Sequence, residues 1–353
     1  MANFIRFHKF LLKTSKASGK NYFFILVDFI SVRRKKGITL DEYYNFEFEN
    51  LSKEFRNSFL TLKEKIKYLS LLNKGYGIVS KSKYFTHLLM NDMKIPTSEL
   101  YLYYNPLLGI ANQNVANSYN SVVDILKKKN VEKCVIKTVD TSHGEGVTLY
   151  TGISYDDEKC SLERYDGEKI DLSEILTQEP LIFESLVEQT KQFSQFNNSS
   201  VNTIRFITSL YPDGTAKIIV ARIKFGRTGS FVDNTGSGGN INAEVDIETG
   251  KIFNVVQFDE WRKITPITHH SDTGALLEGV IIENWEEITR KVIQFQQSHP
   301  FLKLIGWDIA ITNNGPVAIE TNGFCDHGGQ FLMKRGWKKE IEDCYNAWKE
   351  TVK

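Results

Sequence analysis

The chain has 353 residues, enough for two or three domains with substantial cores, and its 41% hydrophobic and 25% charged residues are ordinary for a soluble globular protein. Lys and Arg (44) balance Asp and Glu (43), so no overall positive field favours a nucleic-acid partner. The four cysteines are widely spaced and the apolar stretch at residues 22–30 is too short to span a bilayer. Together these features predict a cytoplasmic protein.

The first part of the chain, residues 1–75, is rich in Lys, Phe, Leu and Tyr and contains no proline. We expect a helical N-terminal module here, because its apolar residues recur at helical spacing. A basic run at residues 33–36 lies beside apolar residues, which admits a weak contact with an anionic membrane surface, although most such runs are solvated. The residues at helical spacing include Leu51, Phe55, Phe59, Leu62 and Ile66.

Further along, an amphipathic helix is expected within residues 81–96, ending before Pro96 because the residue preceding a proline disfavours helix. Strands dominate beyond residue 130, and one more helix is expected near residues 285–297. This mixed order with antiparallel hairpins favours an α+β fold over a doubly wound parallel sheet. The expected strands cover residues 134–139, 147–150, 181–184, 203–210 and 216–225.

Residues 306–323 (GWDIAITNNGPVAIETNG) predict a β-hairpin, because apolar residues alternate on both sides of a TNNG turn. If the turn centres on Asn314, Asp308 faces Glu320, and Asn322 projects from the same face. Facing like charges destabilise a strand pair unless a cation neutralises them, and carboxylate and amide oxygens suit Mg²⁺. The alternative is an exposed hairpin whose acids are merely solvated.

The neighbours of these acids favour the metal site. Trp307, Ile309 and Ile311 on one strand, with Val317 and Ile319 on the other, predict an apolar face for the hairpin. Its polar face is then expected to line a cleft rather than open water.

Two weaker signals concern phosphate and charge. Lys137 ends an apolar strand and precedes a loop in which Gly144 and Gly146 would let the backbone approach a phosphate. Arg222 and Lys224 are two residues apart on a predicted strand, so they share a face and could point into one cleft.

The order Asp, turn, Glu-x-Asn resembles the metal-binding hairpin of ATP-grasp enzymes. The longer motif GWDIAIT…GPVAIETN is similar to that of the sugar-transfer-associated ATP-grasp family, which is found with polysaccharide biosynthesis. The resemblance covers residues 75–345. The resemblance implies two α+β subdomains that clasp ATP, with Asp308, Glu320 and Asn322 binding the magnesium ions that bridge its phosphates. The implied divisions are an N-terminal ATP-grasp subdomain (76–129), a glycine-loop lid (130–188) and a C-terminal subdomain with the metal hairpin (189–353).

The resemblance also implies the nucleotide-binding residues. Lys83 and Lys137 would contact phosphates, and the glycine-rich loop would cover them. The segment 181–188 would hold adenine, with Glu188 on a ribose hydroxyl. A second glycine-rich loop, which contains Asn234, would lie near the γ-phosphate and the acceptor. The full implied set is Lys83, Lys137, Gly144, Gly146, Glu184, Ser185, Val187, Glu188 and Asn234.

One departure bears on catalysis. Peptide-type ATP-grasp ligases often carry an arginine two residues before the first metal Asp, and Gly306 stands there in this chain. We expect Arg222 to stabilise the transition-state charge instead, with Arg205 and Lys224 as further catalytic cations. The sequence assigns no role to residues 270–274 (HSDTG), which are also familiar from the family.

The expected function is an ATP- and Mg²⁺-dependent carboxylate–amine ligase that acts through an acylphosphate on a surface-polysaccharide sugar or precursor. Its substrates would be a small carboxylate and an amine, one of them sugar-linked, and a homodimer is allowed. The alternatives are an ATP-grasp kinase and a nucleotide-binding scaffold for a glycosyltransferase complex.

Overall fold

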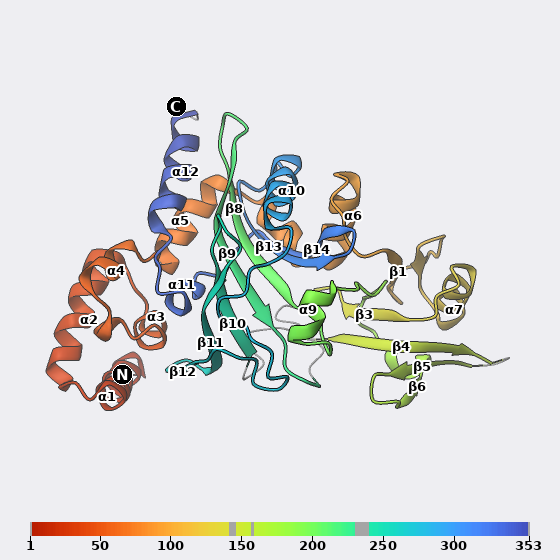
Figure 1. Ribbon diagram of the computed structural model, residues 1–353, viewed down its shortest axis with the longest axis horizontal. Helices are drawn as coiled ribbons and strands as arrows, with labels where there is room; N and C mark the ends of the chain where they lie inside the picture. The colour runs from red at the N-terminus through yellow and green to blue at the C-terminus, as the bar shows by residue number, and fades with distance from the viewer. Residues whose placement is uncertain (1, 141–145, 157–158, 230–239, 352–353) are drawn as a thin grey trace.

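The computed structural model describes residues 2–140, 146–156, 159–229 and 240–351. Within these residues, two sheets of seven strands each form the body of the molecule. We call them the first sheet (β1–β7) and the second sheet (β8–β14). Figure 1 shows the second sheet at the centre, the first sheet at one end of the long axis and the first helices of the chain at the other end. The α+β class and the helical N-terminal region are confirmed.

The first helices pack around an aromatic core, and we call residues 2–59 the aromatic module. The rings of Phe29 and Tyr43 lie 5.3 Å apart at a right angle, and those of Phe48 and Phe59 lie 5.1 Å apart. Such edge-to-face contacts add to the burial of apolar area. The helices are α1 (Ala2–Ser18), α2 (Tyr22–Lys36), α3 (Leu40–Asn45), the 3₁₀ helix η1 (Phe48–Asn50) and α4 (Lys53–Ser58).

The next helix, α5 (Leu62–Leu72), belongs to a different core. Tyr68 and Leu69 of α5 and Ile341 of α12 (Lys338–Thr351) share a cluster with Ile207 and Val220 of the second sheet. The helices expected in residues 1–75 therefore divide between two cores, the aromatic module and the cluster of α5, α12 and the second sheet. The domain divisions expected near residues 75, 129 and 188 stay a prediction.

The first sheet has the strand order β2-β1-β7-β3-β4-β5-β6, and its neighbours are antiparallel except for β1 and β2. Its buried face, with Ile136 and Phe183, packs against Val122 and Leu126 of α7. Its elements are β1 (Leu100–Tyr104), β2 (Val115–Ala116), α7 (Tyr119–Lys128), β3 (Cys134–Thr138), β4 (Val147–Tyr155), β5 (Cys160–Arg164), β6 (Lys169–Asp171), α8 (Leu172–Ile175) and β7 (Leu181–Glu184).

The second sheet is antiparallel with the order β12-β11-β10-β9-β8-β13-β14. Because side chains alternate along a strand, Phe206 and Ile207 of β8 face opposite ways. Phe206 packs on Trp285 of α10, whereas Ile207 joins the cluster of α5 and α12. The elements are α9 (Lys191–Phe196), β8 (Thr203–Leu210), β9 (Ala216–Phe225), β10 (Asn240–Val245), β11 (Ile252–Glu260), β12 (Lys263–Pro266), α10 (Trp285–Ser298), β13 (Leu304–Thr312), β14 (Gly315–Asn322) and α11 (Gly329–Leu332).

The two sheets meet along the β13–β14 hairpin. The chain reaches the first sheet through η2 (Tyr76–Lys81) and α6 (Lys83–Asp92), and Thr97 then forms a bridge with Ala318 of β14. On the way back, the amide of Thr190 donates to the carbonyl of Ile311, at 2.8 Å. Both connections therefore hold the predicted metal hairpin at the junction.

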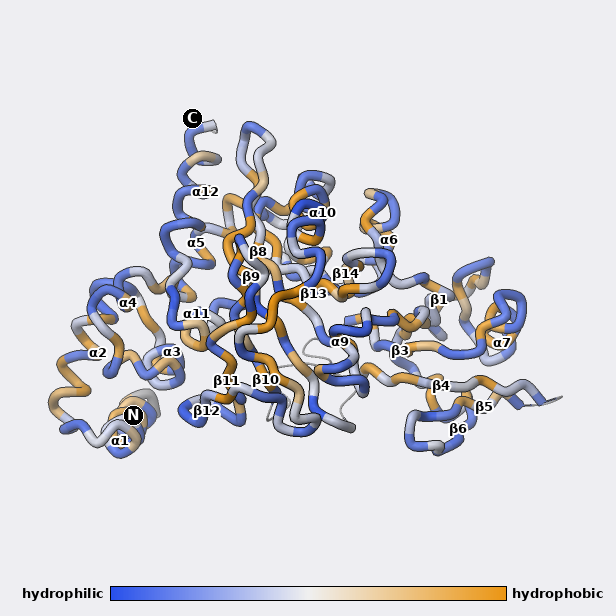
Figure 2. Tube along the Cα trace, viewed as in Figure 1, coloured by the Kyte–Doolittle hydropathy of each residue, from blue (hydrophilic) through white to orange (hydrophobic). Residues whose placement is uncertain are grey.

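Hydropathy follows this layering, with apolar residues concentrated along the strands of both sheets (Figure 2). The outer helix α2 also carries apolar residues, although it lies at the edge of the molecule. In the described part of the chain, no helix has both the length and the apolar character needed to cross a membrane.

Candidate functional site

The β13–β14 hairpin pairs Asp308 with Glu320, as the sequence predicts. The tip differs from the expected one. Thr312 pairs with Gly315, so the turn centres between Asn313 and Asn314 rather than on Asn314. A β-bulge at Ile319 then adds one residue to the return strand and restores the expected register at the carboxylates. The two acids face each other because the shifted turn and the bulge compensate.

The expected apolar face of the hairpin is correct on β13 and wrong on β14. Trp307, Ile309 and Ile311 lie in the core of the second sheet, but their partner from β14 is Ala318 rather than Val317 or Ile319. The shifted turn is the reason, because it places Ala318 opposite Ile309.

Strand pairing extends the hairpin acids into a row of charges across the sheet. Asp308 pairs with Arg205 of β8, Arg205 pairs with Arg222 of β9, and Arg222 pairs with Glu244 of β10. Directly paired residues of antiparallel strands project from the same face. We call this the charged row: Glu320, Asp308, Arg205, Arg222 and Glu244. It brings the two predicted metal-binding carboxylates and the two predicted catalytic arginines to one face.

Asp308 is held by two cations. Arg205 donates to it from Nε to Oδ1 at 2.5 Å and from Nη2 to Oδ2 at 2.7 Å, and Lys224 Nζ lies 3.3 Å from Oδ2. Burial alone would raise the pKa of Asp308, but Arg205 and Lys224 outweigh it and hold that pKa far below its ordinary value. Asp308 is therefore an ionised carboxylate in a buried, positively charged setting.

Glu320 has the opposite electrostatic setting. Its burial and the negative charge of Asp308 raise the pKa of Glu320 above its ordinary value, against the opposing effects of Arg205 and Lys224. A further positive charge beside Glu320 would favour its ionised form. Asn322 lies next to the pair, opposite Gly306, and its buried Nδ2 has no hydrogen-bond partner among the described residues.

This donor set fits a magnesium ion. The described residues hold no group of three His, Cys, Asp or Glu side chains that could bind a metal, so the two carboxylates and the amide oxygen of Asn322 are the donors to consider. Two carboxylates and one amide are hard oxygen donors, and Mg²⁺ commonly keeps waters and substrate phosphates in its remaining positions. The raised pKa of Glu320 agrees with that assignment, because a cation beside Glu320 would favour its ionised form.

On the side of the first sheet, the structure brings together Lys83, Lys137 and Glu184. Lys137 Nζ lies 2.6 Å from Glu184 Oε2, which also accepts from the hydroxyl of Ser98 at 3.0 Å. Burial would raise the pKa of Glu184, but Lys137 and His87 keep it below its ordinary value. Lys83 donates to the carbonyl of Thr138 at 3.0 Å. Burial lowers the pKa of Lys83, and among its neighbours the charge of Glu320 opposes this most.

The glycine-rich loop after β3 is described only at its end, where Gly146 has a φ of +68°. A Cβ there would lie 2.3 Å from Thr138 Oγ1, so the close approach of the two strands requires glycine. The amide of Thr138 donates to the carbonyl of Gly146 at 3.1 Å. Gly144 and Asn234 lie outside the described residues.

In the segment after β7, Ser185 and Glu188 make contacts with other parts of the protein. The amide of Ser185 donates to the carbonyl of Glu99 at 2.8 Å, and its hydroxyl accepts from the Glu99 amide at 2.9 Å. Glu188 pairs with Lys133 at 2.7 Å and is mostly exposed, whereas Val187 is half-buried. The adenine and ribose roles of these residues stay predictions.

The segment His270–Gly274 now has a structural role that the sequence did not reveal. His270 is buried, and its Nδ1 accepts from the Asp272 and Thr273 amides, so its Nε2 carries the proton and donates to the Gly226 carbonyl at 2.8 Å. Asp272 accepts from Arg227 Nε at 2.7 Å, a bond that lowers the pKa of Asp272 to about 2. The segment therefore holds residues 226–228, which follow β9, because Asp272 also accepts from the Thr228 amide at 2.8 Å.

Two acids of this region escaped sequence reasoning. Asp326 Oδ2 lies 3.8 Å from Arg222 Nη2, just after the hairpin. Glu244 accepts from Asn254 Nδ2 at 2.9 Å, and burial raises the pKa of Glu244 to about 7. The signal for Glu244 was present, because polar residues 240, 242 and 244 alternate with apolar ones on one strand.

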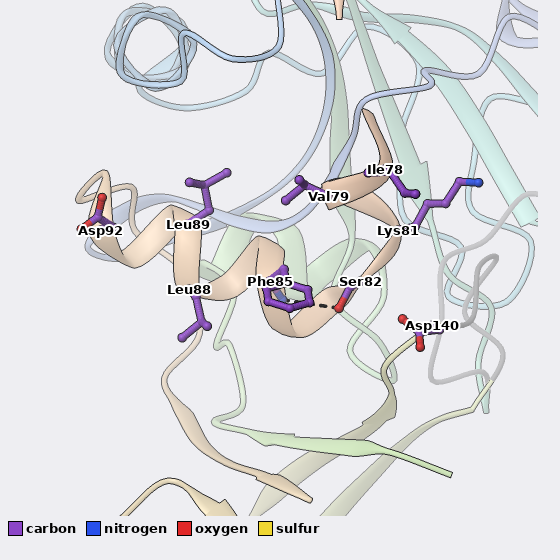
Figure 3. A pocket seen from close by; sticks show the side chains of 9 residues that line it. All are labelled: Ile78, Val79, Lys81, Ser82, Phe85, Leu88, Leu89, Asp92 and Asp140. Carbon is purple, nitrogen blue, oxygen red and sulfur yellow. Dashed lines mark hydrogen bonds between the residues drawn. The ribbon is translucent and has the colours of Figure 1, made fainter. Parts of the chain in front are cut away.

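A separate pocket of 820 Å³ lies on the outer side of η2 and α6 (Figure 3). Its wall is mainly apolar, with Val79, Phe85 and Leu88, and Asp140 lies at one end. Among the predicted site residues that the structure describes, none lines this pocket.

Comparisons with known proteins place this geometry in a family. The sugar-transfer-associated ATP-grasp family matches residues 57–344. Among solved structures, the chain is similar to the ATP-grasp ligase PsnB in complex with its minimal precursor, Mg and ADP, with 13% identity and a TM-score of 0.38 over 78% of this chain and 62% of that one.

Two further solved structures show similarity at the same level. The D-alanine–D-alanine ligase of Helicobacter pylori has 13% identity and a TM-score of 0.40, over 76% of this chain and 61% of that one. The VanG D-Ala:D-Ser ligase of Enterococcus faecalis has 10% identity and a TM-score of 0.44, over 78% of this chain and 63% of that one. The match thus spans less than two thirds of the length of those enzymes.

A comparison with curated protein sequences finds no match. The family match covers most of the chain, from the end of the aromatic module to α12, and it includes both sheets and the whole charged row. The chain belongs to the sugar-transfer-associated ATP-grasp family.

Proposed function

We propose that the protein is an ATP- and Mg²⁺-dependent ligase that joins a substrate carboxylate to an amine through an acylphosphate. The observation that carries the proposal is the charged row, in which two acids suited to Mg²⁺ lie beside two arginines and Lys224 on one buried face. The family is described as associated with sugar transfer. A surface-polysaccharide sugar, or a precursor of one, is therefore the proposed substrate class.

The proposed reaction has two steps. An oxygen of the substrate carboxylate attacks the γ-phosphorus of ATP, so that a new C–O–P linkage forms and the bond to ADP breaks. The amine nitrogen then attacks the acyl carbon, an amide bond forms, phosphate leaves and the amine gives up one proton. Such reactions depend mainly on positioning and on neutralising the phosphate charge.

The chain offers separate groups for these tasks. Asp308, Glu320 and Asn322 would hold Mg²⁺, which supplies neutralisation of phosphate charge when it is bound. Lys83, which donates to the carbonyl of Thr138, and Lys137, which pairs with Glu184, would meet phosphates from the side of the first sheet. Gly146, directly before β4, would belong to the loop that covers the phosphates. Gly144, Glu184, Ser185, Val187, Glu188 and Asn234 complete the proposed nucleotide set.

The geometry around Gly306 suggests how the missing arginine is replaced. A Cβ at this position would lie 3.5 Å from Cδ of Arg205, so the Arg205 side chain passes over the glycine. A guanidinium from the neighbouring strand therefore lies beside the position where related ligases carry one. Arg205 and Arg222 are the proposed stabilisers of the oxyanion, and Lys224 supports them through Asp308.

The test of the metal site is Glu320→Gln. We expect it to abolish ATP turnover at saturating Mg²⁺ while the fold persists, because the change removes one of two repelling acids. Substrate-dependent ADP release across a panel of carboxylates and amines is the measurement, and Glu283→Gln, an exposed acid, is the matched control. Wild-type turnover in Glu320→Gln would refute the assignment.

The test of the oxyanion role is Arg222→Ala. Loss of one such donor typically costs about 10²–10³ in kcat. We expect this fall with little change in the affinity for ATP, and no fall in Arg290→Ala, which removes an exposed arginine from α10. A large loss of ATP affinity with kcat preserved would instead move Arg222 to the nucleotide site.

The glycine at position 306 also favours a second candidate, an ATP-grasp kinase that phosphorylates a hydroxyl and needs no acyl chemistry. Hydroxylamine separates the two, because it traps an acylphosphate as a hydroxamate. A hydroxamate that forms only with ATP and the carboxylate substrate supports the ligase. A stable phosphate ester without hydroxamate supports the kinase.

A further inference from the structure

Helix α2 has two apolar stripes on opposite sides. Ile25, Phe29 and Val32 are buried in the aromatic module, at most 8% exposed. Phe23, Val27 and Ile30 repeat at spacings of four and three residues, and they are 71%, 67% and 36% exposed. A helix with an apolar surface all round is normally buried on all sides, so the outer stripe lacks the cover that its composition calls for.

The next turn of the outer stripe is basic. Arg34 follows Ile30 by four residues, and both are exposed. A surface pocket of 390 Å³ joins the two kinds of side chain, since Val27, Ile30 and Ser31 line it together with Arg34 and Lys35. An apolar strip that ends in two cations matches the acyl boundary and the charged headgroups of an anionic lipid surface.

Helix α1 continues this surface. It packs beside α2 through Phe7 and Phe29, whose rings lie 5.7 Å apart, and His8 Nδ1 lies 2.9 Å from the Tyr22 hydroxyl. Phe4 and Leu12 of α1 are 74% and 49% exposed. Figure 1 shows both helices at the end of the molecule that lies opposite the first sheet, with α2 at the outer edge.

The charge of this region is one-sided. Residues 2–36 contain nine basic residues and one acidic residue, Asp28. Asp28 is already neutralised within the module, because its Oδ1 lies 2.7 Å from Arg56 Nη1 and its Oδ2 accepts from the Tyr43 hydroxyl at 2.5 Å. The basic residues are Arg6, Lys9, Lys13, Lys16, Lys20, Arg33, Arg34, Lys35 and Lys36.

We propose that the outer face of α2, formed by Phe23, Val27, Ile30, Arg34 and Lys35, docks the protein on the surface of an anionic phospholipid membrane. The apolar residues enter the headgroup region while the cations contact lipid phosphates, and the helix lies in the plane of the surface. A second copy of the chain would bring two positive surfaces into contact, and a protein partner would need a matching acidic face, whereas an anionic membrane matches both the apolar stripe and the positive charge. The proposal does not depend on the ligase chemistry.

The test is sedimentation of the full-length protein with vesicles of phosphatidylcholine, either alone or mixed with phosphatidylglycerol. We expect wild-type protein to sediment with the mixed vesicles, to remain in solution with phosphatidylcholine alone, and to be released by salt. Val27→Glu with Ile30→Glu should abolish binding. Arg34→Glu with Lys35→Glu should weaken it by about 30-fold or more, since each basic residue near an anionic surface contributes about 1 kcal/mol.

Two matched variants control for general effects. Leu107→Glu with Ile110→Glu changes two apolar residues that are 77% and 65% exposed in the first half of the chain, away from the aromatic module. Lys127→Glu with Lys128→Glu reverses an adjacent basic pair in the last turn of α7. Both should sediment like wild type, and thermal unfolding of each variant checks its fold.

Three outcomes would overturn the proposal. Wild-type protein could remain in solution with anionic vesicles, or the α2 variants could bind as wild type does, or the control variants could lose as much binding as the α2 variants. Size-exclusion chromatography with light scattering tests a fourth outcome. A dimer that Val27→Glu with Ile30→Glu converts to a monomer would make this face a protein interface.

Discussion

At the scale of single residues, Arg205 and Asp308 form a buried ion pair at the centre of the charged row. Two hydrogen bonds of 2.5 and 2.7 Å join their side chains, and both residues are largely buried. Removing one partner of a buried pair leaves an uncompensated charge, which costs more than removing both. The sequence could not reveal the pair, because its residues are 103 positions apart on strands whose order it does not state.

The first prediction follows from that asymmetry. Arg205→Gln should lower the free energy of unfolding by about 3–5 kcal/mol, because Asp308 keeps only Lys224 as a partner. Adding Asp308→Asn should recover most of the loss, since the stranded charge is then gone. Urea unfolding of the two single variants and the double variant gives the coupling energy. A double variant as unstable as the sum of the two single variants would show that the pair is not coupled.

Glu244 carries the second prediction, which concerns pH. Burial raises the pKa of Glu244 from its ordinary value to about 7, so the folded protein favours the protonated form. The stability from this group is fully present below the unfolded pKa and is lost as the pH rises through about 7. The side chain in Glu244→Gln cannot ionise, so the variant should show no such loss of stability as the pH rises.

Between pH 5 and pH 8 the wild type should therefore lose up to roughly 3 kcal/mol more than Glu244→Gln, at about 1.4 kcal/mol per pKa unit. Denaturant unfolding of both proteins at the two pH values is the measurement. Parallel pH profiles of the two proteins would mean that Glu244 is ionised in the fold throughout.

Among the structural elements, strands were predicted better than their connections. The expected strands at residues 203–210 and 216–225 coincide with β8 and β9, because long apolar alternation between turns leaves little choice of boundary. The bulge at Ile319 was not predictable, since a bulge follows from twist and from contacts with neighbouring strands. The pairing of Asp308 with Glu320 was nevertheless correct, because the bulge offset the shifted turn.

Gly146 supplies the third prediction, at the turn between β3 and β4. Gly146→Ala combines a left-handed backbone, φ +68°, with a Cβ 2.3 Å from Thr138 Oγ1. Gly167→Ala is the matched control, because its φ is +85° but nothing lies within 4 Å of the new Cβ. The control should cost about 1–2 kcal/mol from the backbone alone.

Gly146→Ala should cost clearly more than the control in thermal or urea unfolding, and it should also weaken ADP binding because β3 carries Lys137. Equal costs for the two variants would mean that the neighbouring Thr138 side chain simply turns away. In that case the close approach of β3 and β4 would not depend on glycine.

At the scale of the whole molecule, the sequence predicted the α+β class and the helical start, but not how the helices divide between cores. Helices α1–α4 form the aromatic module, whereas α5 covers the second sheet with α12. Both stretches show the same helical periodicity, so composition could not separate them. Periodicity also could not predict that the site lies at the junction of the two sheets. That position depends on Thr97 and Thr190, which attach the two connections between the sheets to the hairpin.

The last prediction concerns coupling between the two sheets. Each sheet has its own core, and the proposed nucleotide would touch Lys137 on the first sheet and the metal hairpin on the second. A ligand that binds only the folded form at 100 times its Kd adds about 2.7 kcal/mol of stability. ADP with Mg²⁺ should therefore raise the melting temperature measured by calorimetry, and any separate transitions of the two sheets should merge.

Three variants separate the contributions to this shift in melting temperature. Glu320→Gln should lose the part of the shift that requires Mg²⁺, and Lys137→Ala should lose most of the shift both with and without Mg²⁺. Glu283→Gln should behave like wild type. An undiminished Mg²⁺-dependent shift in Glu320→Gln would show that the ion is held elsewhere.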